Sequence, residues 1–299
     1  MYKFYESDLC RQMSDTLILN GKSESTRLAY MRQVRTLSDF FDKPPDKITE
    51  EEIRRFLIHR KTKDKLAPAS MRLIHGALRY FYQKFLNREW RSLSLMKSEN
   101  ERRLPAILSA PEVRRILERE TRFHNLAYFV AVYSMGLRLS EGLSLWVSDI
   151  DSDRKMVHVH RGKGAKDRYV PLPDDTLLLL RKYWVTHKNP VWLFPAIGRD
   201  AKSAPTADEP MSRSSVQGAF KRARLKAGIT KRYVSIHTLR HSYATHLLEN
   251  GVHIRAIQKY MGHTNLETTM KYLHLTSYGQ EESVKRVNAV MRGWKNEND

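Results

Sequence analysis

The 299-residue sequence has a single cysteine, Cys10, and contains no long apolar run. One thiol cannot form an intramolecular disulfide, and its isolation excludes a cysteine-rich metal site. No segment approaches the about 18–20 apolar residues that a membrane span requires. Residues 1–6 lack the apolar core of a signal peptide. We therefore expect a globular protein that is not inserted in a membrane and that is found in the cytoplasm.

Acidic residues are also scarce relative to basic ones. There are 53 Lys and Arg against 33 Asp and Glu, which gives a formal net charge of +20 and a pI of about 10.0. The basic residues are spread over both halves of the chain and interleaved with apolar ones. This pattern is typical of folded surfaces that face a polyanion, and double-stranded DNA is the leading candidate. A membrane surface, or solubility alone, would also account for basic charge.

The first part of the chain, residues 1–97, carries helical patterns. Apolar residues recur at helical spacing over 25–41, and two prolines stop that helix. A capping box at 49–52 begins the next helix, and Pro68 opens another. With a weaker helix near 6–19, these signals predict a compact four-helix basic domain.

A polar, charged segment ending in proline favours an interdomain linker over residues 98–108. The second predicted domain, 109–299, begins with a capping box and continues with helices. Residues 156–160 and 168–172 flank a glycine-containing turn, which predicts a β-hairpin. Helical patterns return after it and are interrupted by a polar loop at 198–213. The fold class expected is mainly α with a small β-sheet, an α+β arrangement.

Arg138 follows a glycine between two apolar helical runs. An arginine near the start of a helix can donate two parallel hydrogen bonds to a phosphate. An ion pair at the surface or between domains would explain the same residue. Glu141, three residues later, can face the same way and brace Arg138 as a partner behind the site.

The turn of the predicted hairpin carries Lys163. A lysine on a loop can deliver a proton to a departing alkoxide and so act as a general acid. Basic residues in turns are usually only solvated, however. Lys166 and Arg168 compete for the same role on chemistry alone.

His237 and Arg240 stand at positions i and i+3 of a helix predicted to begin near Ser235, so both side chains share one face. A His-x-x-Arg pair is common and by itself carries little information. We expect His241 and His246 to pack or to form structural hydrogen bonds. A zinc site among these histidines is disfavoured because no matching carboxylate or cysteine spacing accompanies them.

Tyr272 lies nine positions after His263. Residues 264–267 form a capping box that predicts a short helix, with Tyr272 about two turns into it. A tyrosine there can attack a phosphodiester, although most tyrosines at such positions are half-buried packing residues. Tyr243 and Tyr278 are rival nucleophiles.

Taken in chain order, these residues resemble the active site of the tyrosine recombinases, the phage integrase and Xer family. The matching segments include flanking residues and are 104–109, 136–141, 161–164, 168–172, 237–248, 262–263 and 271–272. One minor departure is Met261, where leucine is more usual before the Gly-His pair. In the family the reactive lysine stands in the first Gly-Lys-Gly of the hairpin and the nucleophile in the helix after Gly-His. The resemblance therefore implies the catalytic set Arg138, Lys163, His237, Arg240, His263 and Tyr272.

The resemblance also implies a fold and a mechanism. The first domain would be the SAM-like core-binding domain and the second the catalytic domain, clamping double-stranded DNA as a homo-tetramer on two sites. Cleavage would leave a 3′-phosphotyrosine and a free 5′-hydroxyl, conserving the phosphodiester energy. No cofactor, metal or nucleotide is expected. The tail from Glu281, with a helical apolar stripe, would dock on a neighbouring protomer, although packing on its own domain is the alternative.

Two other functions would use the same features in part. A type IB topoisomerase shares the chemistry without pairing two sites, but the N-terminal helical domain argues against it. A non-catalytic DNA-binding regulator would leave the ordered catalytic set unexplained. The sequence leaves open the target DNA, the outcome of strand exchange, and whether a partner recombinase or DNA-bending protein takes part.

Overall fold

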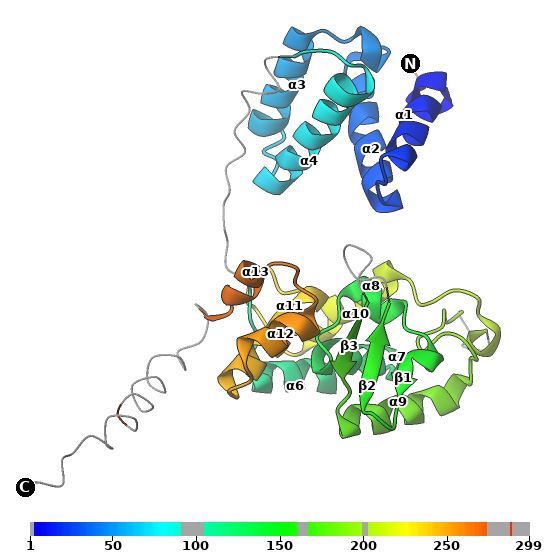
Figure 1. Ribbon diagram of the computed structural model, residues 1–299, viewed down its shortest axis with the longest axis vertical. Helices are drawn as coiled ribbons and strands as arrows, with labels where there is room; N and C mark the ends of the chain where they lie inside the picture. Colours follow the sequence, from blue (N-terminus) through cyan, green and yellow to red (C-terminus); the bar gives the residue numbers. More distant parts are fainter. Residues whose placement is uncertain (1–2, 91–104, 161–166, 199–202, 274–287, 289–299) are drawn as a thin grey trace, which may run out of the picture. The chain divides into compact units, whose positions relative to one another are not determined.

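The computed structural model describes residues 3–90, 105–160, 167–198, 203–273 and 288, and the chain divides into two compact units, Met1–Arg103 and Leu104–Asp299 (Figure 1). Each unit has its own hydrophobic cluster. Within the described ranges no helix has the length and apolar character needed to cross a membrane. The expected class is confirmed, because the described elements are mainly helices with one small antiparallel sheet.

The first unit is helical, as its sequence predicts. Its elements are η1 Phe4–Glu6, α1 Asp8–Leu19, α2 Glu24–Phe41, η2 Pro45–Lys47, α3 Glu50–Thr62, α4 Pro68–Arg79 and the π-helical turn η3 Tyr80–Phe85. The capping box of α3 forms as expected, with the Thr49 side chain accepting from the backbone of Glu52 and Glu52 accepting from the backbone of Thr49. The π-helical turn was not expected from the sequence, which predicts one continuous apolar stripe through this region.

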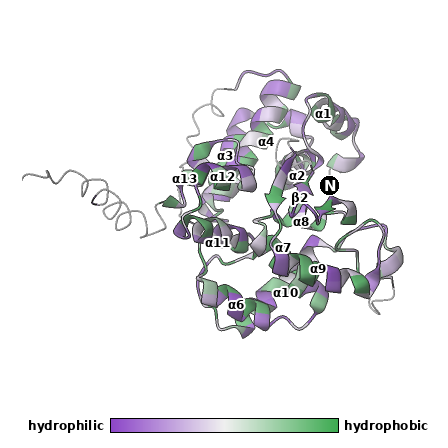
Figure 2. Cartoon of the chain, turned by 60° about the horizontal axis from the view of Figure 1, so that its bottom comes forward, coloured by the Kyte–Doolittle hydropathy of each residue, from purple (hydrophilic) through white to green (hydrophobic). Residues whose placement is uncertain are grey.

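Apolar packing holds the first unit together. Both hydrophobic and hydrophilic residues occur along each of its helices (Figure 2), as amphipathic helices require. Val34, Leu37 and Phe56 are fully buried in its cluster. Tyr82 is also buried there and donates its hydroxyl hydrogen bond to the Pro45 carbonyl, at 2.6 Å. A buried tyrosine hydroxyl needs such a partner, because an unpaired one would cost free energy.

The second unit contains the sheet and the remaining helices. Its elements are α6 Ala110–Glu118, α7 Phe123–Ser134, α8 Leu139–Leu143, η4 Val147–Asp149, β1 Ile150–Asp151, β2 Met156–Val159, β3 Arg168–Pro171, α9 Asp174–His187, η5 Ala204–Thr206, α10 Arg213–Lys226, α11 Ile236–Glu249, α12 Ile254–Met261 and α13 Leu266–Met270. The capping box at Ser109 and Glu112 begins α6 as predicted.

The sheet has three antiparallel strands in the order β1-β2-β3. Val157 of β2 pairs with Val170 of β3, and Val159 pairs with Arg168, which confirms the predicted hairpin. The short strand β1 was not predicted. Its two residues are too few to show an alternating pattern. The turn that carries Lys163 and Lys166 lies outside the described residues.

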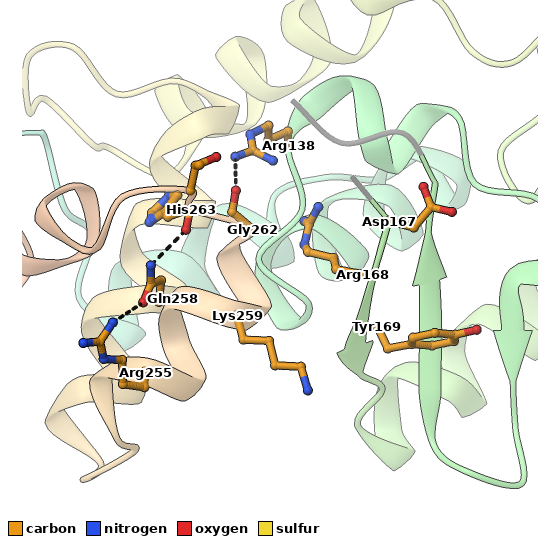
Figure 3. A pocket seen from close by; sticks show the side chains of 10 residues that line it. Arg138, Asp167, Arg168, Tyr169, Arg255, Gln258, Lys259, Gly262 and His263 are labelled. Carbon is orange, nitrogen blue, oxygen red and sulfur yellow. Dashed lines mark hydrogen bonds between the residues drawn. The ribbon is translucent and has the colours of Figure 1, made fainter. Parts of the chain in front are cut away.

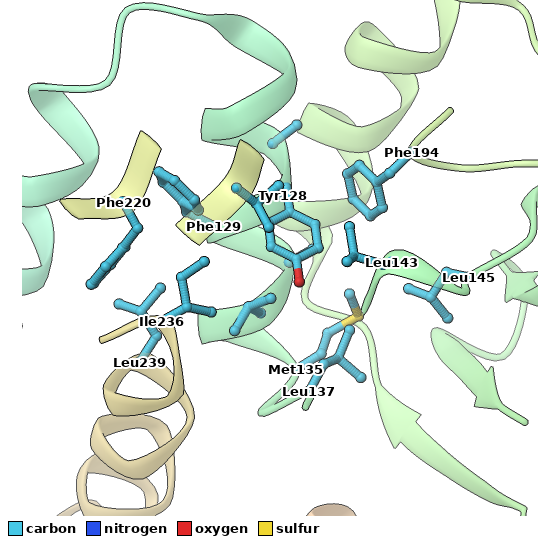
Figure 4. Packing of buried hydrophobic residues seen from close by; sticks show 14 of the residues in the cluster. Tyr128, Phe129, Met135, Leu137, Leu143, Leu145, Phe194, Phe220, Ile236 and Leu239 are labelled. Atoms are coloured by element: carbon cyan, nitrogen blue, oxygen red, sulfur yellow. The ribbon is translucent and has the colours of Figure 1, made fainter. Parts of the chain in front are cut away.

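The core of the second unit lies among α7, α10, α11 and the sheet. Tyr128 and Phe129 of α7 occupy its middle, and Phe194 and Phe220 pack against them edge to face (Figure 4). The helix α7 is mostly apolar, as expected of a helix surrounded by others. It leads directly into the turn before Arg138, so the core fixes where the candidate site begins.

Candidate active site

Arg138 is the N-cap of the five-residue helix α8. Its backbone N–H donates to Glu141 Oε2 at 2.7 Å, and its guanidinium donates to Glu141 Oε1 at 2.5 Å. Gly136, with φ of +60°, makes the turn that ends α7 and frees the chain for this cap. The predicted bracing of Arg138 by Glu141 is therefore present.

Two further arginines form ion pairs with Glu141. Arg168 forms a bidentate pair with it at 2.8 and 2.9 Å, and Arg240 Nη1 lies 3.6 Å from Glu141 Oε2. Burial by itself would raise the pKa of Glu141, but the hydrogen bonds and charge of Arg168, the Arg138 backbone and Arg240 lower it to about 2. Three guanidinium charges against one carboxylate leave a local excess of two positive charges (3 − 1 = 2). Such an excess suits a phosphodiester, whose negative charge grows during attack.

Two carbonyl groups position Arg240. It is only 2% exposed, and its guanidinium donates to the Gly136 carbonyl at 2.5 Å and to the Met261 carbonyl. Arg138 in turn donates to the Gly262 carbonyl at 3.0 Å. Residues 261–262, at the end of α12, thus hold both predicted phosphate-binding arginines. Because backbone carbonyls already hold the two guanidinium groups, these groups need little reordering when a phosphate arrives.

His263 lies beside Arg240. Its Nε2 is 3.5 Å from Arg240 Nη2, and its Nδ1 is 2.9 Å from the Thr269 hydroxyl. Burial, followed by the charges of Arg240 and Arg138, lowers the pKa of His263 to about 3. The imidazole is therefore neutral at physiological pH and can donate or accept one hydrogen bond at the site.

The hydroxyl of Tyr272 lies 2.8 Å from His241 Nδ1. The tyrosine ring stacks on that of His263, with 6.3 Å between centroids and 16° between planes, and its side chain is almost fully buried. Burial raises the pKa of Tyr272 to about 12, although Arg240 and Arg138 act in the opposite direction. Burial, with charge from His237 and Arg240, lowers the pKa of His241 to about 4. His241 is therefore neutral and can accept a hydrogen bond from the Tyr272 hydroxyl.

The expected helical context of Tyr272 is wrong in detail. Asn265, not Thr264, caps α13 by accepting from the backbone of Glu267, and the helix ends at Met270. Tyr272 lies in the turn beyond, where its N–H donates to the Thr269 carbonyl at 3.0 Å. This i to i+3 bond tightens the chain and brings the ring into the cluster of Tyr243, Ile257 and Met261.

The rival candidates have different surroundings. Tyr243 is 8% exposed and packs on Gly136, where a Cβ would lie 2.4 Å from its ring. Arg168 is buried against Glu141 and the Tyr260 carbonyl, so it is not a loop-borne proton donor. Tyr278, like Lys163 and the predicted docking tail, lies outside the described residues.

His237 and Arg240 share one face of α11, but they differ in exposure. His237 is exposed, whereas Arg240 is buried. Although part of His237 reaches the surface, the protein around its ring displaces water from it, and this desolvation, followed by the charges of Arg240 and Arg138, lowers the pKa of His237. His237 is therefore placed to meet a ligand from solvent, while Arg240 reaches it from within the protein. His246, expected to be structural, bonds the Tyr133 hydroxyl at 2.8 Å.

A cavity of about 500 Å³ opens beside these groups (Figure 3). Arg138 and His263 line it on one side, with Arg255, Gln258 and Lys259 of α12 and Tyr169 of β3 around it. The basic side chains make its lining attractive to an anion of phosphate size or larger. Tyr272 and Arg240 do not line this cavity, because both are packed behind it.

Two contacts at the site could not be expected from the sequence. His241 forms a hydrogen bond, as expected, but its partner is the Tyr272 hydroxyl. Arg168 was weighed only as a proton donor, yet it neutralises Glu141. His241 follows Arg240 directly on α11, which is the only sign in the sequence that it lies near the site. The contact itself forms because the turn at 271–273 brings Tyr272 to His241.

The phage integrase family profile matches residues 100–278, and the profile of the phage integrase N-terminal SAM-like domain matches residues 9–92. The chain belongs to the phage integrase family. It is 36% identical over 270 residues to a putative integrase/recombinase of Sinorhizobium fredii, which covers 90% of this chain and 85% of the relative.

Similarity to Xer recombinases narrows the family further. The chain is 35% identical over 273 residues to tyrosine recombinase XerD of Oceanobacillus iheyensis, covering 87% of this chain and 90% of that protein. A solved structure of a lambda integrase tetramer bound to a Holliday junction shares the fold, with a TM-score of 0.71, 19% identity, and coverage of 88% of this chain and 76% of that one. This integrase-family chain is thus an Xer-like tyrosine-type site-specific recombinase that acts on DNA.

Proposed function

We propose that this recombinase cleaves and rejoins duplex DNA through a 3′-phosphotyrosyl bond at Tyr272 and exchanges strands between two sites. The observation that carries the proposal is that Arg138 and Arg240 share one buried carboxylate, while His263 contacts Arg240, stacks on Tyr272 and lines the basic cavity together with Arg138. A phosphodiester held by the two arginines would lie next to the tyrosine, and their fixed charges would stabilise the pentacoordinate transition state.

The attack itself needs a proton acceptor. The Tyr272 oxygen bonds the phosphorus, the 5′-oxygen departs, and the phenolic proton passes to His241 Nδ1, 2.8 Å away. The support for His241 in this step is its position against the hydroxyl, and because burial keeps the imidazole neutral, a nitrogen lone pair is available to the phenolic proton. His237 and His263 would hold the non-bridging oxygens.

The proton for the departing 5′-oxygen would come from Lys163. This assignment rests on family resemblance, since Lys163 lies outside the described residues. The resulting 5′-hydroxyl attacks the phosphotyrosine of a second strand in the reverse of the first step, so no nucleotide is consumed.

The tetramer on two DNA sites is likewise part of the proposal. The lambda integrase of similar fold is a tetramer on a Holliday junction in its solved structure. Four copies supply the four tyrosines that two duplexes require, one for each strand. The first unit, matched by the SAM-like profile, would contribute the second DNA-binding surface of each protomer.

The decisive test is Tyr272→Phe, which removes the attacking oxygen and keeps the ring. We expect DNA binding to persist and the denaturant-resistant protein–DNA adduct on a nicked suicide substrate to disappear. Tyr243→Phe, a change to a neighbouring buried tyrosine, is the control and should leave the adduct intact. An adduct that survives in Tyr272→Phe would refute the assignment and direct attention to Tyr278.

A second test separates the two proton transfers. A substrate with sulfur in place of the 5′-oxygen has a leaving group that needs no proton. Lys163→Ala should lose roughly 100-fold or more in cleavage of ordinary DNA and recover on the sulfur substrate, whereas His241→Ala should not recover. Rescue of both variants, or of neither, would contradict these roles. Raising the pH should partly restore His241→Ala, because it ionises Tyr272 directly.

A further inference from the structure

A second cluster of polar side chains lies on the sheet, and one of its members, Asp167, also lines the cavity of the candidate active site. His158 of β2 and His160, the residue after the strand, alternate with the buried Val157 and Val159, so both imidazoles project from the same face. Their ring centroids are 4.0 Å apart. Neither histidine belongs to the proposed catalytic set.

Asp149, at the end of η4, completes the cluster from the neighbouring segment. Its side chain is only 3% exposed, and one carboxylate oxygen contacts His160 Nε2. The other oxygen accepts a hydrogen bond from the Trp146 backbone at 2.8 Å, which fixes the carboxylate orientation. One ligand atom from each of Asp149, His158 and His160 lies within 4.8 Å of the others.

A fourth oxygen donor is present beside the two histidines. Asp167 Oδ2, just before β3, lies 3.3 Å from His158 Nε2 and 4.0 Å from His160 Nδ1. Tyr169 stacks on the His158 ring with centroids 4.7 Å apart and limits its rotation. The two imidazoles belong to His158 of β2 and to His160 just after it, and the carboxylates of Asp149 and Asp167 lie near different nitrogens of His160.

We propose that Asp149, His158 and His160, with Asp167 as the fourth ligand, bind a divalent transition metal of the Zn²⁺ class. Zn²⁺ takes imidazole nitrogen and carboxylate oxygen at about 2.0–2.2 Å in a tetrahedral shell, which separates ligand atoms by about 3.3–3.6 Å. Side-chain rotations that open the direct contact between Asp149 and His160 and draw the more distant ligand atoms together by about 1 Å would meet that requirement. Two carboxylates neutralise the dication, and nitrogen ligands favour Zn²⁺ over Mg²⁺ or Ca²⁺.

The site would be structural and not catalytic. The metal would join η4 to β2 and to the first residue before β3, the strand whose Arg168 binds Glu141. The oriented Asp149 carboxylate resembles the hydrogen-bonded ligands that metal sites generally use. Strand cleavage, which uses the arginines and Tyr272, does not pass through this metal.

The test is a titration of tag-free, chelator-treated full-length protein with Co²⁺, whose tetrahedral complexes absorb visible light strongly. We expect one Co²⁺ per chain, displaced by Zn²⁺, and a rise in melting temperature with Zn²⁺. His158→Ala and Asp149→Asn should each weaken binding by about 100-fold or more. His75→Gln, a histidine change in the first unit, should have no effect.

As a control for folding, the circular dichroism spectrum of each variant is measured without metal. His160→Gln, whose amide can still donate to Asp149, provides a ligand-deleted variant with a preserved contact. Absence of stoichiometric Co²⁺ binding to the wild-type chain would overturn the proposal. So would equal binding by wild type, Asp149→Asn and His160→Gln, or loss of binding in His263→Ala instead.

Discussion

Each unit has a glutamate at the third position of a helix that closes a capping box, yet the two residues differ in what surrounds them. Glu52 of the first unit accepts from the Thr49 backbone at 2.8 Å and from Lys43 Nζ at 2.6 Å, with 22% of its side chain exposed. Glu141 of the second unit is 5% exposed and receives Arg138, Arg168 and Arg240. Both carboxyls have a pKa lowered to about 2.

The same local pattern therefore has two uses. Glu52 owes its low pKa mainly to its hydrogen bonds with Lys43 and the Thr49 backbone, at the edge of a core built from apolar side chains. Glu141 is ionised in spite of its burial, because three cations compensate it. A capping box locates the start of a helix, but it does not reveal whether the carboxylate also organises a buried set of charges.

The largest expected effect is on stability. Glu141→Gln would leave Arg168 and Arg240 buried without their anion, and the free energy of unfolding of the second unit should fall by roughly 3–5 kcal/mol. Glu52→Gln, the matched change in the first unit, should cost about 1 kcal/mol. Hydrogen exchange followed by mass spectrometry separates peptides of the two units during urea unfolding. Equal losses in the two variants would remove the distinction between the glutamates.

The next largest effect is on the cleavage rate, when an arginine that pairs with Glu141 is replaced. Arg240→Ala should cost roughly 3 kcal/mol or more in single-turnover cleavage, the scale for losing a preorganised transition-state donor, and change duplex affinity little. Arg240→Lys, which keeps the charge but not the forked geometry, guards against a folding defect. Arg35→Ala in the first unit should leave the cleavage rate of bound DNA unchanged.

Binding and cleavage must be measured on the same DNA across a salt series. With a net charge of +20, affinity should fall by roughly 0.9 log units per log unit of salt for each phosphate neutralised. If Arg240→Ala lost affinity and cleavage in proportion, the residue would be an anchor for the duplex and not a transition-state donor.

A smaller effect should appear in acid. The folded-state pKa of Glu141, about 2, lies below its ordinary value of 4.5, so its contribution is complete above pH 4.5 and lost as pH falls toward 2. The contribution corresponds to about 3–4 kcal/mol. The stability difference between wild type and Glu141→Gln should therefore shrink between about pH 5 and about pH 3. A difference that stays constant over this range would contradict an ionised Glu141.

The smallest expected effect is that of metal chelation on cleavage, which should be zero. Because Arg138 and Arg240 supply the cations at the phosphate, cleavage should persist in EDTA without nucleotide. The same treatment should lower the melting temperature of the metal-loaded protein through the cluster at Asp149. Loss of cleavage in EDTA, restored by added metal, would refute the proposed chemistry.

Much of this arrangement was predictable from local signals. The capping boxes at Thr49 and Ser109, the proline that opens α4, and the hairpin strands all depend on neighbouring residues, and the structure confirms them. Arg138 and Glu141 are three residues apart, so their pairing could also be expected. The identity of the candidate residues came from the ordered resemblance to the recombinases.

Interactions across long sequence separations were not predictable. The bond between His241 and Tyr272 depends on a tightened turn after α13, and the pair of Arg168 with Glu141 depends on how β3 packs. The cluster of Asp149 with His158 and His160 depends on strand β1, which was too short to detect. In each case tertiary packing decided which polar groups meet.

The carbonyl groups that hold the two arginines have a consequence for folding. Arg240 is tethered to the Gly136 carbonyl across 104 residues of sequence, and Arg138 to the Gly262 carbonyl across 124. Contacts that close such long loops form late in folding, because the entropy cost of closing the loop must first be overcome. A partly folded chain therefore cannot bring its two phosphate-binding arginines together. Competence to break DNA arises with the complete native fold, and an unfinished or damaged copy of the protein lacks it.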